Sequence, residues 1–426
     1  MRNVAVLLSM TLVASVAHAE GVEPKNPKAS TASRVYAATT LLNAADGGLI
    51  SVGFSTLARM APGARKFETL HSIKGDSLSR VATGKQGEVL AMWEKDPSIH
   101  YFTRDGRHVM LPQPSPPREG INRFEVEFLG FLPNEREALV HMAGSELGKS
   151  MRYDVTFRIT LNGSKPPEPV VQMVSARQID MNVQRAVYVL PKKAGQGCDQ
   201  RGCDPVGEVV AFVFDENGNA QRKTILNGAE LPVTNVHMVW GQKDAPLILR
   251  VELQRNERVL ARWRPGDAKA EVRPITRSSH GEPRFYALAS GDVVETNVDY
   301  DEGLTLMRHG VDGSRHVTAV PVLADPDNYD HHVHGIGVRE DGRLWMQWGD
   351  HLLFFGRNTD AAPRVHNIEP LLTRRAEWAG VDVYVPSQDV LWVGIDSARS
   401  RDFVRLDLAD ADKRAKPFAQ QKVTRE

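Results

Sequence analysis

The residues best suited to acid–base or metal chemistry form one short polar run at positions 325–334, DPDNYDHHVH. Side chains two positions apart in an extended chain share a face, so His332 and His334 would point the same way. Imidazoles that converge in this manner can hold a divalent metal or act as acid and base. The spacing matches no closed zinc pattern, and a solvated loop is the alternative interpretation.

Two other short stretches match known functional motifs, but each lacks the structural surroundings that the motif requires. Residues 75–79, GDSLS, look like the nucleophile block of GDSL-type esterases, but here they link two predicted strands where the esterase serine precedes a helix. Residues 297–303, NVDYDEG, imitate the start of a calcium loop without the distal glutamate that completes an EF-hand. We interpret both stretches as turns.

Cys198 and Cys203 are the two cysteines of the chain and share a glycine-rich loop, GQGCDQRGCDPVG. The short separation lets their Cα atoms approach to about 5.5 Å, as a disulfide requires. We predict that they bond to each other in an oxidising compartment, because two thiolates alone do not complete a metal site.

The N-terminus predicts export. Arg2 precedes an apolar run, and Ala17-His18-Ala19 has the form of a signal peptidase site, so residues 1–19 are predicted to be a signal peptide. An uncleaved anchor is the alternative, but the run is short for a bilayer span. A polar linker at 20–31 and a single domain at 32–426 would follow, giving a soluble protein of the periplasm or the extracellular space.

The charges are balanced, with 53 Lys and Arg against 53 Asp and Glu. This balance predicts no general binding to nucleic acid or to a membrane surface. No later stretch is long and apolar enough to span a bilayer, so we predict no membrane insertion, and the oligomeric state stays open. The fold of a chain of 426 residues with two cysteines must be stabilised by the packing of a hydrophobic core rather than by a framework of disulfides.

Most of the chain repeats a pattern of four short extended runs. In residues 331–371, HGIGV and RLWMQW flank a turn at 340–342, and HLLFFG and RVHNI flank another at 358–360. Branched and aromatic residues cut by Gly, Asp and Asn favour strands and hairpins. Eight such units, with strands A to D in each, account for the predicted domain. The first strand A is RVYAATTL at 34–41, and the last strand D is KPFAQQKV at 416–423.

This repeat of four strands resembles the β-propeller superfamily along nearly all of the mature sequence, without the Trp-Asp ending of WD40 repeats or the paired glycines of kelch repeats. The predicted fold is therefore an all-β propeller of four-stranded blades. We favour eight blades, and seven would result if the first unit shared its sheet with the last. A β-sandwich is the alternative, but it has no reason to keep so regular a period.

The resemblance implies that strand A is innermost and that its start lies at one mouth of a central channel. Seven of the eight strand A starts are basic: Arg34, Arg80, Arg123, Arg177, His237, Arg284 and His334. Such a rim could bind carboxylates or phosphates, although each Arg could instead close its own blade. His332, His334, His237 and His280 would enter at the same rim as candidate metal ligands.

These observations leave two functions open. The first is an exported binding protein that presents loops and a basic rim to a protein or an acidic ligand, because no catalytic motif is intact and variable loops on a rigid support are a common binding design. The alternative is a hydrolase or lyase acting on an acidic polymer, with a divalent metal or His residues at the channel mouth.

Overall fold

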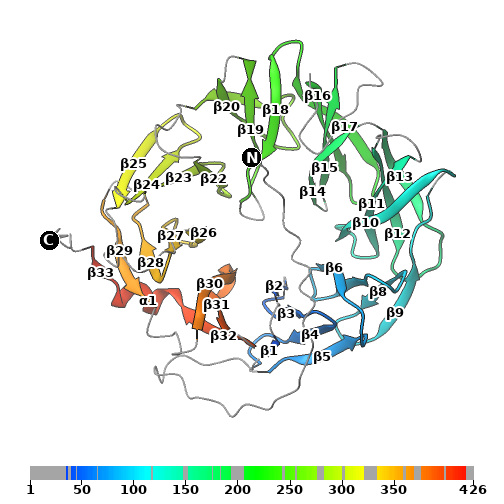
Figure 1. Ribbon diagram of the computed structural model, residues 1–426, viewed down its shortest axis with the longest axis horizontal. Coiled ribbons are helices and arrows are strands. Elements are labelled where there is room, and N and C mark those ends of the chain that lie inside the picture. Colours follow the sequence, from blue (N-terminus) through cyan, green and yellow to red (C-terminus); the bar gives the residue numbers. More distant parts are fainter. Residues whose placement is uncertain are drawn as a thin grey trace.

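A computed structural model of the chain shows a closed ring of sheets, with the colours of the sequence running once around the circle (Figure 1). The residues that it describes are 35–36, 40–44, 46–64, 66–116, 119–146, 152–174, 176–182, 184–192, 206–241, 245–254, 257–275, 283–299, 303–320, 333–357, 361–368, 376–397 and 400–418.

Blades 1 to 4 are antiparallel four-stranded sheets whose strands follow the chain from the inside of the ring outward. Blade 1 has β2 (Thr40–Asn43), β3 (Leu49–Val52), β4 (Thr56–Met60) and β5 (Glu68–Ser72). Blade 2 has β6 (Leu78–Thr83), β7 (Val89–Trp93), β8 (Ser98–Phe102) and β9 (His108–Pro112). Blade 3 has β10 (Ile121–Phe131), β11 (Glu137–Glu146), β12 (Arg152–Thr160) and β13 (Glu168–Val174). Blade 4 has β14 (Arg177–Asn182), β15 (Arg185–Pro191), β16 (Val206–Phe214) and β17 (Ala220–Asn227).

Blades 5 to 7 repeat this order. Blade 5 has β18 (Val233–Met238), β19 (Leu247–Leu253), β20 (Arg258–Trp263) and β21 (Glu271–Pro274). Blade 6 has β22 (Arg284–Ala287), β23 (Val293–Asp299), β24 (Gly303–His309) and β25 (Arg315–Val320). Blade 7 has β26 (Val333–Val338), β27 (Leu344–Trp348), β28 (His351–Phe354) and β29 (Arg364–Asn367).

The eighth blade joins the two ends of the chain. It consists of β30 (Ala376–Val385), β31 (Val390–Ser397), β32 (Ser400–Asp407) and β1 (Val35–Tyr36), and β1 pairs with β32 as the outermost strand. The chain is an eight-bladed β-propeller. The prediction of one innermost strand over 34–41 is wrong, because β1 belongs to the last blade and β2 begins the first. The two ends of the chain do share the last sheet, but the number of sheets is still eight, because β2 to β5 form a complete first blade without β1.

The C-terminal segment also differs from the prediction of a strand over 416–423. After β32 the chain forms the helix α1 (Leu408–Arg414), and β33 (Lys416–Pro417) then adds a fifth strand to blade 7 by pairing with β29. The buried carboxylate of Asp412 on α1 accepts hydrogen bonds from Arg339 at 2.9 Å and Arg343 at 2.6 Å, and it also pairs with Arg364. These charged bonds fix the helix against blade 7.

Burial follows strand position within a blade. Strand β7 is buried at every position, whereas β9, at the outer edge, alternates between exposed and covered positions. Inner strands lie between two neighbouring sheets and are therefore apolar on both faces, which is why their sequence reads as a continuous hydrophobic run. Trp93, Trp263 and Trp345 are among the largest fully buried side chains. Trp240 is 74 % exposed in the turn after β18, although packing between blades is the default expectation for a Trp there.

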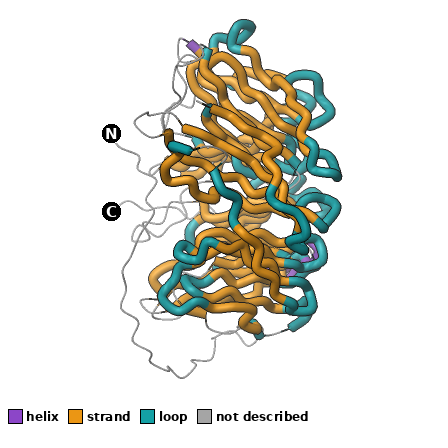
Figure 2. The backbone as a smooth tube through the Cα atoms, turned by 90° about the vertical axis from the view of Figure 1, so that its right-hand side faces the viewer, coloured by secondary structure: helices purple, strands orange, loops and turns teal. Residues whose placement is uncertain are grey.

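The connections divide between two faces of the disc. Because the strands alternate in direction, the turns from A to B and from C to D lie on one face, which we call the lower face; the connections from B to C and from D to A lie on the other, the upper face. Figure 2 shows the ring edge-on, with most of the described turns along one side. Across the described residues, no helix combines the length and the apolar character needed to cross a bilayer.

Arginines on strand C tie several blades to the next one at the lower face. Each donates to a backbone carbonyl in the C–D turn of the following blade: Arg59 to Arg104, Arg158 to Asn217, and Arg308 to Arg357. Gly218, with φ +77°, makes room for one of these contacts, because a Cβ there would lie 2.7 Å from Cδ of Arg158. Gly218 therefore serves the joint between blades 3 and 4 as well as its own turn.

The Asp412 cluster gives a test of the C-terminal closure. Asp412→Ala would leave three guanidinium groups without their shared buried carboxylate, and we expect the free energy of unfolding to fall by about 3 kcal/mol. Asp410→Ala on the same helix is the matched control: its side chain is 59 % exposed and its ion pairs are long, so we expect a loss below about 1 kcal/mol. Denaturant unfolding measures both, and equal losses would contradict the structural role of Asp412.

Candidate functional site

The innermost strands share an irregularity that redirects side chains. Strand β10 carries a β-bulge at Glu127, because Val126 pairs with Met142 while Phe128 pairs with His141. Corresponding extra residues are Ser79 in β6, Ile179 in β14, Thr234 in β18, His334 in β26 and Asp382 in β30. A bulge places two residues opposite one and re-aims a side chain, which is a common device beside ligand sites.

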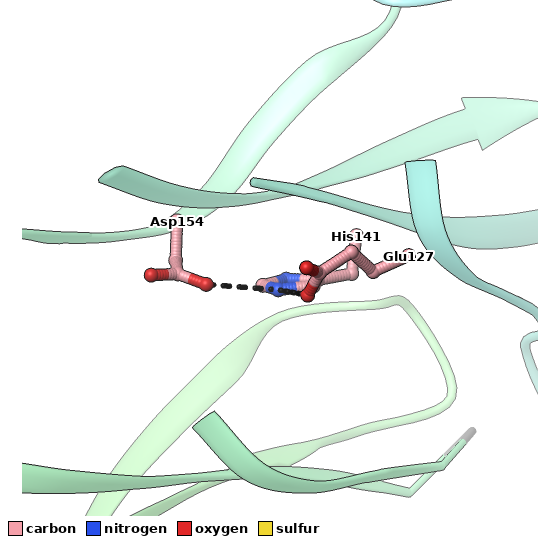
Figure 3. Close-up of side chains that lie close together, drawn as sticks. All are labelled: Glu127, His141 and Asp154. Carbon is pink, nitrogen blue, oxygen red and sulfur yellow. Dashed lines mark hydrogen bonds and ion pairs between the residues drawn. The ribbon is translucent and has the colours of Figure 1, made fainter. Parts of the chain in front are cut away.

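The bulge at Glu127 brings that carboxylate to a buried polar cluster in blade 3 (Figure 3). His141 of β11 and Asp154 of β12 are both 0 % exposed. His141 Nε2 lies 3.2 Å from Asp154 Oδ1 and 3.8 Å from Glu127 Oε2, and His141 Nδ1 lies 3.1 Å from Thr156 Oγ1. With its proton on Nε2, the imidazole donates to Asp154 and accepts from the threonine hydroxyl.

Arg152 supplies the cation of this cluster. Its Nε donates to Asp154 Oδ1 at 2.9 Å and Oδ2 at 3.0 Å, and its Nη2 pairs with Glu127. Burial lowers the pKa of the guanidinium, but the charges of Asp154 and Glu127 outweigh burial and raise it above its ordinary value. One guanidinium thus links both carboxylates.

Glu127, His141 and Asp154 each offer a ligand atom within 4.8 Å of the others, which is the spacing of a metal site. A divalent cation there would have to displace Arg152 from both carboxylates, and both imidazole nitrogens already have partners. Action of His141 as a base would likewise require opening a cluster that is closed to solvent at His141 and Asp154. The cluster is better suited to joining strands than to catalysis.

Tyr188 extends the cluster into the next blade. Its hydroxyl on β15 lies 3.5 Å from His141 Nδ1, so blades 3 and 4 meet at this polar point. Burial raises the pKa of the Tyr188 phenol well above its ordinary value, and a hydrogen bond with Thr156 offsets only part of that effect.

The upper mouth of the ring contains two of the predicted basic residues in exposed positions. Arg80 lies on β6, where its Nε donates to the Glu127 carbonyl at 2.9 Å and its Nη1 to the Ser79 carbonyl at 2.7 Å. Arg284 begins β22, and no described residue bonds to its guanidinium. Blades 2 and 6 face each other across the ring (Figure 1). Neither arginine pairs with a described carboxylate.

An exposed aromatic residue lies on the upper face of blade 1. Phe54 is 62 % exposed in the turn between β3 and β4, and its carbonyl accepts a hydrogen bond from Leu78 N at the start of β6. The upper face therefore presents an apolar ring on blade 1 and a cation, Arg80, on blade 2.

The other predicted rim residues have different placements. Arg177 begins β14 and interacts with other groups. The prediction that His237 starts an innermost strand is wrong, because β18 begins at Val233 and His237, which also has an interaction, lies near its end. Arg123 and His334 lie in β10 and β26. Outside the described residues are Arg34, His280, His332, Cys198 and Cys203, so the predicted disulfide and the histidine set remain predictions.

Sequence reasoning missed Glu127, His141 and Asp154. One signal was present, since His141 interrupts an apolar run, LVHMA, and Asp154 does the same in RYDVTF. A polar residue within a buried strand needs a partner, which predicts a buried network. The bulge that adds Glu127 depends on pairing between strands and has no comparable sequence signal.

No protein-family model matches the chain, and no curated protein matches it. Solved structures do align. A virginiamycin B lyase from Staphylococcus aureus has 10 % identity over 88 % of this chain and 98 % of its own, with a TM-score of 0.38. The WD40 domain of SCAP from fission yeast has 10 % identity over 91 % and 98 %, with a TM-score of 0.47. YCF48 bound to D1 peptide has 13 % identity over 90 % and 96 %, with a TM-score of 0.42. These values transfer no function to this chain.

The buried phenol predicts a pH dependence. Because the folded pKa of Tyr188 exceeds its unfolded value near 10, its contribution to stability is complete below about pH 10 and is lost as pH rises toward the folded pKa. We expect Tyr188→Phe to reduce the alkaline slope of the free energy of unfolding by up to about 1.4 kcal/mol per pH unit. Denaturant unfolding from pH 8 to 11.5 measures the slope, and an unchanged slope in the variant would contradict the assignment.

Proposed function

We propose that this propeller is an exported binding protein whose upper mouth receives an acidic segment of a protein or another acidic ligand. The observation that supports it most directly is the exposure of Arg80 and Arg284 at the starts of opposite innermost strands without a described carboxylate partner. Guanidinium groups present fork-like donors that match carboxylates.

The contrast with other arginines supports this assignment. Arg59, Arg158, Arg262 and Arg308 on strands C each pair with a carboxylate. These four arginines of strand C are neutralised, whereas the two at the mouth have no carboxylate partner among the described residues. Uncompensated cations on a concave rim attract anions more strongly than the same charges on a convex surface.

Phe54 adds an apolar contact to the proposed surface. A ligand that carried only charge would gain little from an aromatic ring on the same face as Arg80, whereas an acidic peptide with an apolar side chain long enough to reach blade 1 would use both. Buried aromatic and arginine contacts commonly dominate protein interfaces. Export rests on the predicted signal peptide at 1–19 and belongs to the same proposal.

A hydrolase or lyase acting on an acidic polymer is the competing proposal. The place of His334 near the start of the innermost strand β26 supports it, and His332 and His280 are its predicted companions at that rim, whereas His237 lies near the opposite end of β18. A divalent metal held by these histidines would act as the Lewis acid.

Charge removal at the mouth tests the binding proposal. We expect Arg80→Ala/Arg284→Ala to bind poly-L-glutamate at least about tenfold more weakly, because two cations that contact the ligand are lost. Binding of the unmodified protein should weaken as salt rises, since exposed contacts are screened over about 8 to 10 Å. Titration calorimetry at several salt concentrations measures both effects.

Arg104→Ala/Arg107→Ala is the matched control, because it removes the same charge from exposed positions in a lower-face turn of blade 2. We expect this control to keep its affinity and both variants to unfold within about 2 °C of the parent. Equal loss of affinity in the two variants would show a general charge effect and would contradict a site at the upper mouth.

Turnover distinguishes the competing proposal. Under the binding proposal, incubation with polygalacturonate and a divalent metal should release no new reducing ends and no unsaturated product. Turnover that His334→Ala abolishes would instead support the hydrolase or lyase and would sink the binding proposal. Product assays at the end of the incubation measure both.

A further inference from the structure

Three histidines meet at the joint between blades 1 and 2, away from the upper mouth. They are His71 on β5, His100 on β8 and His108 on β9. Their ring centroids form a nearly equilateral triangle, with separations of 5.1 Å for His71 and His100 and 5.0 Å for each of the other two pairs. The strands come from two sheets, so the cluster bridges the joint.

The ring centroids of the triangle have the separations of a metal site. A zinc ion binds imidazole nitrogen at about 2.0 to 2.1 Å, which places ring centroids about 3.2 Å from the metal and about 5.2 Å from each other in a tetrahedral arrangement. His100 Nδ1 and His108 Nε2 are 3.0 Å apart, slightly closer than the roughly 3.3 Å between two nitrogens of such a site. The nitrogens of all three rings do not lie within 4.8 Å of one another, so His71 has to turn before it can join the other two.

Asp96 orients the central imidazole. Its Oδ2 lies 3.1 Å from His100 Nε2, so the proton of neutral His100 resides on Nε2 and the lone pair of Nδ1 points toward His108. A carboxylate bonded to the far nitrogen of a ligating histidine is the usual outer partner of a metal site. The loop itself is held by the buried Asp76, which accepts hydrogen bonds from Lys95 N at 3.0 Å and Asp96 N at 3.2 Å.

Access also suits a cation. His108 is exposed and His71 is half-buried, whereas His100 is 1 % exposed and packs against Trp93. In contrast to the cluster around His141, no Arg or Lys pairs with Asp96 among the described residues.

We propose that His71, His100 and His108 form a binding site for a divalent transition-metal ion such as Zn²⁺, with Asp96 as the outer partner of His100. His100 Nδ1 and His108 Nε2 supply two ligands by replacing their shared proton. His71 would supply the third ligand after its side chain rotates, because its nitrogens do not lie within 4.8 Å of those of both other histidines in this structure. The ion ties β5 of blade 1 to β8 and β9 of blade 2 and is independent of ligand binding at the upper mouth.

Zinc titration of the untagged, chelator-stripped protein tests the site. We expect one equivalent of Zn²⁺ to bind at this site, His71→Gln/His108→Gln to lower its affinity at least about a hundredfold, and Asp96→Asn to lower it about tenfold. A saturating excess of Zn²⁺ should raise the thermal midpoint of the parent by at least about 2 °C and leave that of the double variant unchanged. Circular dichroism in chelator confirms that each variant is folded.

His316→Ala is the matched control, because His316 lies on β25, the outer strand of blade 6 that corresponds to β9. This control should bind Zn²⁺ like the parent. A His332→Ala/His334→Ala variant distinguishes the proposed site from the histidines predicted near the upper mouth. This variant should also bind one equivalent of Zn²⁺. Absence of Zn²⁺ binding in the parent, or binding that survives His71→Gln/His108→Gln, would overturn the proposal and leave the three rings as an aromatic packing cluster.

Discussion

Each sheet of this protein can bury its two faces only against the sheets on either side, and this requirement forces the ring to close. The strands that lie deepest, such as β7, are apolar on both faces and would expose one of them at any gap. Closure uses the N-terminal β1 as the outer strand of the last blade. It is reinforced at the inside, where Asp382 of β30 accepts a hydrogen bond from Leu41 N of β2 at 2.6 Å. Two chain ends that are distant in sequence are thereby fixed together, and the ring of sheets is closed.

Two sets of arginines differ in what surrounds them. Arg59, Arg158 and Arg308 of strand C reach across joints to turn carbonyls and are neutralised by nearby carboxylates, as at Arg308 and Asp292. At the upper mouth Arg80 bonds only to carbonyls among the described residues. A carbonyl satisfies a donor without cancelling a charge. The binding proposal rests on this difference.

Two joints contain buried histidines, and their surroundings give them different capacities. His141 lies among two carboxylates and an arginine, and its hydrogen bonds close the cluster within blade 3. His100 lies among two other histidines and one carboxylate, with two of its neighbours open to solvent. Burial of polar groups is costly unless they are paired. The cluster at His141 meets that requirement with the guanidinium of Arg152. The cluster at His100 contains no such cation, and we propose that a bound metal ion takes that part.

The sequence by itself determined the repeat, most of the strands and the propeller fold, and it favoured eight blades over seven, because runs of branched and aromatic residues cut by turn residues are local signals that survive in each unit. It also identified Arg80 and Arg284 as basic residues at the starts of innermost strands. Only the tertiary structure decided that residues 35–36 complete the last blade and that residues 408–414 form a helix, since both depend on partners far away in sequence. The same holds for the clusters at His141 and His100. Register, a bulge at Glu127 and the meeting of two sheets bring those side chains together, and none of these is encoded in the spacing of residues along the chain.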